Sequence, residues 1–194
     1  MYEYIKGTIV EANPSCVVIE CANVGYRVHV SVNTYSKLMV GQQILLYIHQ
    51  IVREDAHLLY GFYTKEERAL FCSLISVSGI GANTANVMLS SMSVEEIEGA
   101  IMTENIHAIK SVKGIGIKTA QRMIIELKDK VGKHGTSMEV SVATNSSVLK
   151  EEAVAALIML GFQRSQVIKT VYKLLSSSSV SSVEELIKQA LKNL

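Results

Sequence analysis

Residues 109–123, with the sequence IKSVKGIGIKTAQRM, are the stretch around which the rest of the chain is organised. The pattern predicts a helix, a tight glycine turn and a second helix over Thr119–Leu127. Gly114 and Gly116 have no side chains, so a phosphate can approach the peptide N–H groups of the turn. The positive N-terminal end of the second helix faces the same place. The stretch therefore predicts a phosphate-binding turn.

Cationic side chains accompany this turn. Lys118 and Arg122 are four residues apart, on one face of the expected helix, and Thr119 stands at the start of that helix. Such a site holds a nucleic-acid backbone without reading its bases, because phosphates carry no base identity. A single Gly-x-Gly can equally be a helix C-cap followed by an ordinary turn.

The same pattern occurs a second time, 35 residues earlier. Residues 76–88 align with residues 111–123, and eight of the thirteen positions are identical. The earlier copy has Gly79 and Gly81 at the turn and Asn83 beside it. The repetition favours a tandem helix-hairpin-helix unit that contacts a duplex at two points. A dinucleotide fingerprint would need a third glycine, and a P-loop would need a lysine directly after its last glycine.

The composition limits the other classes of function. With 194 residues and a net charge of +1, the chain fits one or two domains, or more if they are small, and any basic surface has to be local. The longest apolar run, residues 153–160, is far too short to span a membrane, so no membrane partner is expected. The three cysteines lack Cys-x-x-Cys spacing and the five histidines are scattered singly. No metal or other cofactor is expected.

Residues 1–63 alternate between apolar and polar positions and predict a β-domain. Five strands with a short helix between the third and the fourth resemble an OB-fold, a small barrel that often binds nucleic acids. A small barrel without a ligand remains the alternative. The expected elements are strands at Tyr4–Ala12, Cys16–Cys21, Tyr26–Val32, Ile44–Val52 and His57–Tyr63 and a helix at Asn33–Met39.

The turn between the last two strands is acidic. It has the sequence Arg53-Glu54-Asp55-Ala56 and lies at the tip of a long hairpin. Two neighbouring carboxylates in a turn are usually just solvated side chains. In a protein that binds DNA they would repel phosphates, so their position would affect binding.

Residues 64–133 predict an all-α domain that contains both glycine turns. Capping boxes beginning at Thr64 and at Ser93 open two of its helices. Residues 134–147 are rich in Gly, Ser, Thr and Asn without a helical period, which predicts a flexible linker. The predicted fold class is therefore α+β and multidomain.

Residues 148–194 predict a three-helix module that resembles a ubiquitin-associated (UBA) bundle. The helices are expected at Val148–Leu160, at Gln163–Leu175 and after a third capping box that begins at Ser182. A short bundle after a linker suggests docking of a partner. Most of its apolar residues must nevertheless fill its own small core.

Together these segments resemble the RuvA family of bacterial Holliday-junction-binding proteins. The resemblance covers nearly the whole chain, in the order barrel, tandem hairpins, linker and C-terminal module. Its most specific stretches are VREDA at 52–56, LYGF at 59–62, GIGIKTA at 114–120 and AVAAL at 153–157.

The resemblance implies a non-catalytic subunit, without a cofactor, that binds four-way junction DNA. It implies a fourfold-symmetric homotetramer, or an octamer of two tetramers, in the bacterial cytoplasm at the nucleoid. The implied partner is RuvB, a hexameric ATPase that drives branch migration in DNA recombination, DNA repair and the SOS response to DNA damage. The junction resolvase RuvC is a candidate further partner.

The resemblance also assigns roles to residues. The acidic pin would be Glu54 and Asp55, and Ala82-Asn83 replaces the Pro-Lys that often follows the second glycine of the first hairpin in the family. That replacement removes one cation from each subunit, so weaker affinity or a shallower salt dependence is expected. The DNA-binding positions would be Gly79, Gly81, Asn83, Gly114, Gly116, Lys118, Thr119 and Arg122, and the partner-binding positions Leu157, Leu160 and Phe162.

Two other classes of function stay open on the residues alone. DNA glycosylases and nucleases also contain helix-hairpin-helix units, and a glycosylase needs a catalytic Asp or Lys aimed at a flipped base. Asp129 is the one aspartate after the second turn, and it lies between two lysines on what is expected to be a solvated helix. A protein-interaction adaptor that uses only the C-terminal module is the other alternative.

Overall fold

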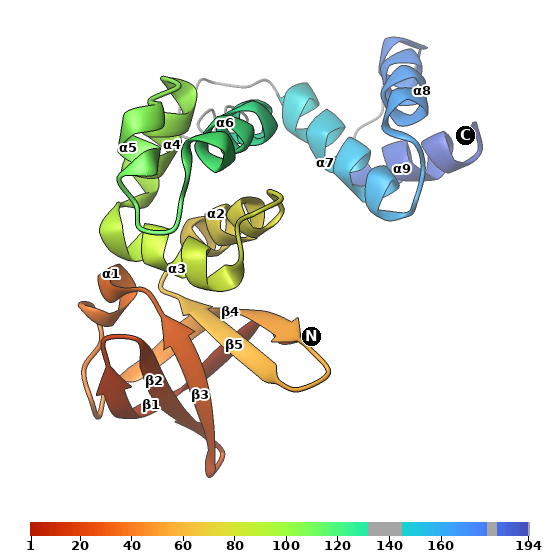
Figure 1. The fold of residues 1–194 in the computed structure, drawn as a ribbon. Helices are drawn as coiled ribbons and strands as arrows, with labels where there is room; N and C mark the ends of the chain where they lie inside the picture. The colour runs from red at the N-terminus through yellow and green to blue at the C-terminus, as the bar shows by residue number, and fades with distance from the viewer. Residues whose placement is uncertain (132–144, 178–181, 194) are drawn as a thin grey trace. The chain divides into compact units, whose positions relative to one another are not determined.

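A computed structural model describes residues 1–131, 145–177 and 182–193. The chain divides into two compact units, Met1–Thr136 and Ser137–Leu194. Among the described residues, the first unit contains a β-barrel with helices packed on it (Figure 1), and the second contains three helices. The expected α+β multidomain class is confirmed. Residues 134–144 of the expected linker lie outside the described residues.

The N-terminal strands close into a five-stranded barrel in the order β1-β2-β3-β5-β4. Neighbouring strands are antiparallel except β3 and β5, which pair in parallel at His29–Tyr60 and Val30–Gly61. Side chains that alternate along the strands fill the barrel, among them the fully buried Ile9, Ile19 and Ile48. The strands are β1 (Tyr4–Asn13), β2 (Cys16–Cys21), β3 (Val24–Val30), β4 (Gln43–Val52) and β5 (His57–Phe62).

The third strand ends earlier than predicted. It was expected to reach Val32, but Ser31 is the N-cap of the short helix α1 (Val32–Tyr35), and its hydroxyl accepts a hydrogen bond from the Thr34 N–H. The alternation of inward and outward side chains that is typical of a strand therefore stops after Val30. Ser31 is fully buried and Val32 is 48% exposed, which is the reverse of the predicted alternation.

Five helices complete the first unit, and their apolar faces share one core with the end of β5. The rings of Phe62 and Phe71 lie 4.8 Å apart between centroids, so the barrel and the helices are packed directly against each other. α6 starts two residues before the predicted Thr119. The helices are α2 (Lys65–Ile75), α3 (Ala82–Ser91), α4 (Val94–Met102), α5 (Ile106–Lys110) and α6 (Ile117–Val131).

The two capping boxes predicted for this unit differ in the structure. At Ser93 the box is complete, because Ser93 and Glu96 each accept the other's backbone N–H. At Thr64 only half of it forms, with the Thr64 hydroxyl accepting the Glu67 N–H. The Glu67 carboxylate turns instead toward the barrel, where it accepts hydrogen bonds from Ser31 and Thr34.

The described residues of the second unit form α7 (Asn145–Met159), α8 (Arg164–Ser177) and α9 (Val183–Leu191). Its small core contains Ala153, Leu157, Val167, Val171, Leu186 and Ala190. Residues 145–147 were predicted to belong to the linker. They are instead helical, because α7 begins at Asn145. The N-cap at Ser182 is confirmed, with its hydroxyl accepting the Glu185 N–H. α8 reaches Ser177, two residues beyond the predicted Leu175, and residues 178–181 lie outside the described part of the chain.

Candidate nucleic-acid interface

The two glycine turns have the same backbone geometry. Gly79 and Gly114 have φ angles of +95° and +94°, a region that L side chains rarely adopt. In both turns the residue after this glycine donates its N–H to the carbonyl three positions earlier, from Ile80 to Val77 at 3.0 Å and from Ile115 to Val112 at 3.2 Å. The repeat found in the sequence is thus also a repeat of conformation.

The two turns lie against each other reciprocally. A Cβ atom built on Gly79 would be 3.7 Å from the Thr119 side chain, and one built on Gly114 would be 4.0 Å from that of Thr84. Thr84 and Thr119 occupy the same position in the two copies of the repeat. Each turn therefore packs beside the helix start of the other, which relates the two hairpins by an approximate twofold axis.

The second glycine of each turn faces open space. A Cβ atom on Gly81 or on Gly116 would meet no atom within 4 Å. These glycines directly precede α3 and α6, so the free N–H groups of two helix N-termini are exposed beside them. The arrangement offers two neighbouring sites to the phosphates of one duplex.

The predicted cations lie on the exposed side of α6. Lys118 and Arg122 are both exposed, within the first two turns of the helix. Arg122 also donates a hydrogen bond from Nη1 to the Ser78 carbonyl at 3.3 Å. One side chain of the second hairpin thus supports the backbone of the first, a contact that the sequence did not indicate.

Asn83 is oriented by the barrel. The Tyr60 hydroxyl, on β5, donates to Asn83 Oδ1 at 2.9 Å. Tyr60 is 2% exposed, and this burial raises the pKa of its phenol, so the hydroxyl keeps its proton and acts as the donor. Because Oδ1 is occupied in this way, the amide NH₂ of the exposed Asn83 is the group left to meet a phosphate. Sequence reasoning missed Tyr60, since no spacing or motif links a strand residue to a helix 23 positions later.

Replacing Asn83 with lysine should strengthen DNA binding. It would restore a cation beside the first turn, and the slope of log affinity against log salt should steepen by about 0.9 per phosphate contacted. Tyr60 would lose its acceptor, so the free energy of unfolding should fall by about 1 kcal/mol. Salt-dependent fluorescence anisotropy measures the first effect and thermal melting the second.

The matched control for that variant is Asn13→Lys, which adds the same charge at an exposed position at the end of β1. It should leave the salt slope unchanged. Equal slopes for Asn83→Lys and the wild type would mean that the first turn does not meet a phosphate at this position.

The acidic tip, which comprises Glu54 and Asp55, is at the turn between β4 and β5 as predicted. The Arg53 N–H donates to the Ala56 carbonyl at 2.8 Å and closes the turn, and both carboxylates are exposed. The long hairpin projects away from the helices α2–α6 (Figure 1).

The predicted partner-binding residues of the second unit differ in accessibility. Leu157 is fully buried in the core of this unit, which does not fit the expectation that it faces a partner. It follows a helical period shared with Ala153, and this period places it inside. Leu160 is 61% exposed and Phe162 is partly buried against the core, while Met159, not predicted, is 88% exposed.

An enzyme with helix-hairpin-helix units would need a catalytic side chain aimed at its substrate, or a metal site. Asp129 is exposed on α6. Within residues 1–131, 145–177 and 182–193, no three His, Cys, Asp or Glu side chains gather as they would around a metal ion. None of the helices described is long and apolar enough to cross a membrane.

Family comparisons match nearly the whole chain. The model described as RuvA N terminal domain matches residues 1–61, and that described as RuvA, C-terminal domain matches residues 149–194. Between them, residues 71–129 match a SAM-like helix-hairpin-helix tandem. The three matched segments follow one another in the order barrel, helical hairpins and C-terminal helices.

Curated relatives are similar over their full length. Proteins from Bacteroides fragilis, Porphyromonas gingivalis and Christiangramia forsetii are each 48% identical to this chain, with 100% of both chains covered. Each of these relatives bears the name Holliday junction branch migration complex subunit RuvA.

Proposed function

The chain belongs to the RuvA family, and we propose that it is the subunit of a branch migration complex that binds Holliday junctions. The observation that carries this proposal is the reciprocal pair of glycine turns, with two exposed helix N-termini side by side. Two phosphate sites at a fixed separation suit a duplex backbone better than a single small ligand. The subunit contacts phosphates and not base edges, so it recognises the shape of the DNA.

Each duplex arm of the junction is held by one such pair of turns. Gly81 and Gly116 allow the backbone to come close, while Lys118 and Arg122 add charge. Gly79, Gly114 and Thr119 keep the two turns in register. Asn83 donates to a phosphate from its free amide group.

The acidic tip selects an open junction. In a fourfold-symmetric tetramer, or in two such tetramers on one junction, the tips gather at the centre where strands exchange. Glu54 and Asp55 repel any phosphate backbone that crosses them, so a linear duplex is penalised and an open junction is not. The barrel thus contributes specificity while the helices contribute affinity.

The second unit recruits the ATPase RuvB, which supplies the energy for branch migration, and this chain is itself non-catalytic. Exposed apolar side chains around Leu160, with the partly buried Phe162, are suited to such docking. The assembly acts in recombination and DNA repair in the bacterial cytoplasm, at the nucleoid, with RuvC as a candidate further partner.

Gel shifts of the full chain on a synthetic four-way junction and on a linear duplex of the same length test this function. Tighter binding to the junction and no cleavage of labelled DNA are expected. A chain ending at Lys133 should bind the junction equally well and fail to stimulate RuvB. Equal affinity for the two DNAs would refute junction recognition, and DNA cleavage or base release would favour an enzyme.

A further inference from the structure

The boundary between the barrel and the helices of the first unit contains an unusual polar cluster. In the described part of the chain, three polar or charged residues are less than a tenth exposed: Ser31, Thr34 and Glu67, at 0%, 1% and 7%. All three belong to one cluster. Ser31 and Thr34 come from the barrel side, and Glu67 comes from the first turn of α2.

The Glu67 carboxylate accepts hydrogen bonds from Ser31, Thr34 and Tyr63. Ser31 Oγ donates to Oε1 at 2.9 Å, and Thr34 Oγ1 lies 2.8 Å from both carboxylate oxygens. The Tyr63 N–H, in the connection between β5 and α2, donates to Oε2 at 3.1 Å. Both oxygens of the carboxylate are therefore held by donors from the barrel side and from the connection to α2.

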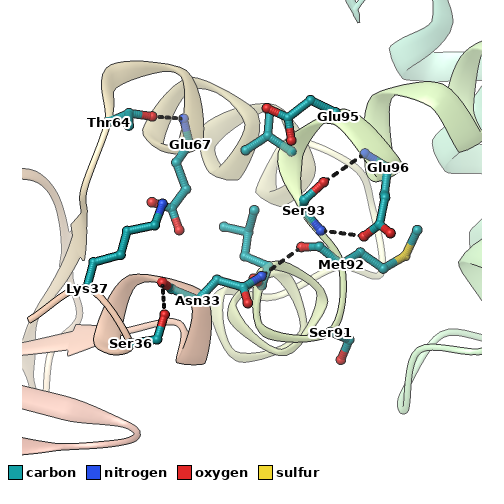
Figure 2. Close-up of a pocket in the computed structure, with 12 residues that line it drawn as sticks. Asn33, Ser36, Lys37, Thr64, Glu67, Ser91, Met92, Ser93, Glu95 and Glu96 are labelled. Atoms are coloured by element: carbon teal, nitrogen blue, oxygen red, sulfur yellow. Dashed lines mark hydrogen bonds between the residues drawn. The ribbon is translucent and has the colours of Figure 1, made fainter.

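Further hydrogen bonds join the segment 30–33 of the barrel side to α3. Asn33 Nδ2 donates to the Leu89 carbonyl at 2.7 Å and to the Met92 carbonyl at 3.2 Å, at the end of α3. Asn86 Nδ2 donates to the Val30 carbonyl at 3.1 Å. Figure 2 shows Asn33 reaching Met92, and Lys37 extending toward Glu67, on the two sides of the pocket between α1 and α4.

Polar contacts of this kind fix an orientation. The apolar contact between Phe62 and Phe71 holds the barrel and helices together, but hydrophobic burial is non-directional and tolerates small rotations. Hydrogen bonds to one carboxylate depend on direction, and a buried carboxylate that loses its donors is costly. Rotation of the barrel about this boundary would break the bonds from Ser31 and Thr34 together.

The acidic tip amplifies any such rotation. It lies at the far end of β5, whose six residues span about 20 Å at about 3.3 Å per residue. A rotation of about 10° at the boundary would move the tip by roughly 3 to 4 Å over that length. This is a large part of the Debye length of about 8 Å over which its charge acts on phosphates.

We infer that Glu67 is a positioning residue for junction recognition: it sets the angle between barrel and helices, and thereby the place of the acidic tip relative to the two glycine turns. The inference rests on the proposed function. On this inference, different parts of one subunit determine its affinity for DNA and its discrimination between junction and linear DNA. Affinity for the arms of an open junction depends on the glycine turns, whereas repulsion of a linear duplex, and with it the discrimination between the two DNAs, depends also on Glu67.

The test compares full-length Glu67→Ala with Glu66→Ala, which removes the same charge from an exposed neighbour on the same helical turn. Dissociation constants for linear and four-way DNA are measured at one salt concentration and well below the melting temperature. For Glu67→Ala the ratio of the two constants should fall about fivefold through tighter binding of linear duplex, because displaced tips no longer repel it, while affinity for the junction stays within about twofold. Glu66→Ala should behave as the wild type.

A role in stability alone gives a different result. Glu67→Ala would then melt at a lower temperature, yet its folded fraction would keep the wild-type ratio, which would overturn the inference. Thr34→Val, which removes one donor and keeps the side-chain shape, supplies the same test if Glu67→Ala does not fold. Glu67→Gln should restore part of the ratio. A wild-type protein without junction preference would instead refute the proposed function.

Discussion

Replacing both Lys118 and Arg122 with glutamate should weaken DNA binding by roughly 100-fold, at about 1.5 kcal/mol for each charge-assisted hydrogen bond lost. Both side chains are exposed at the start of α6, beside the second glycine turn. The loss should be the same for all DNA sequences, because phosphates carry no base identity. The salt dependence of the affinity should also become shallower. Titrations by fluorescence anisotropy at several salt concentrations measure both quantities.

Two comparisons make this result specific. Lys169→Glu with Lys188→Glu makes the same change in net charge at exposed positions of the second unit, and it should leave binding unchanged. Arg122 also donates a hydrogen bond to the Ser78 carbonyl of the first hairpin. Arg122→Gln alone should therefore weaken DNA binding and also lower the free energy of unfolding. If the double glutamate variant kept the wild-type affinity and salt slope, the glycine turns would not be the DNA-binding surface.

The local features of the fold could be predicted from the sequence because their causes are local. The positive φ angles at Gly79 and Gly114 follow from glycine at those positions, and the repeat made the second turn predictable from the first. The turn at Arg53–Ala56 followed from the polar residues between two β-patterns. Each of these features depends on residues within a few positions of each other.

Contacts between distant segments could not be predicted in the same way. Glu67 was expected to complete a capping box with Thr64, but its carboxylate reaches Ser31 and Thr34, more than thirty residues away. At Ser93 the box is complete, with Glu96 accepting the Ser93 N–H at 2.8 Å and Ser93 accepting the Glu96 N–H at 3.2 Å. A local motif thus yields to a tertiary partner when burial makes that partner more favourable.

The sequence also did not predict which apolar residues of the second unit are buried. Leu157 and Leu160 were both expected to face a partner, since both are apolar and lie near the end of one helix. The structure places Leu157 in the core and leaves Leu160 61% exposed. A bundle this small uses the same residue types for its core and for its surface, so the sequence pattern alone could not assign them.

Replacing Glu54 and Asp55 together with asparagine should strengthen binding to linear duplex about tenfold and reduce the preference for four-way DNA by the same factor. A carboxylate and a phosphate 8 Å apart in water repel each other by about 0.5 kcal/mol, so three such pairs give about 1.5 kcal/mol. A linear duplex across the centre of a tetramer experiences this repulsion, and an open junction avoids it. Asparagine keeps the size of the side chains and their preference for turns. The measurement is the ratio of the two dissociation constants at one salt concentration.

The control for the acidic tip removes two carboxylates from elsewhere on the same barrel. Glu11→Gln with Glu20→Gln changes exposed positions on β1 and β2 and should leave the ratio at its wild-type value. A closed turn at a hairpin tip buries little surface. The free energy of unfolding of the asparagine variant should therefore lie within about 0.5 kcal/mol of the wild-type value. The effect should also shrink at 1 M salt, where the Debye length falls to about 3 Å. If the ratio is unchanged in the asparagine variant, Glu54 and Asp55 are ordinary solvated turn residues and junction selectivity arises elsewhere.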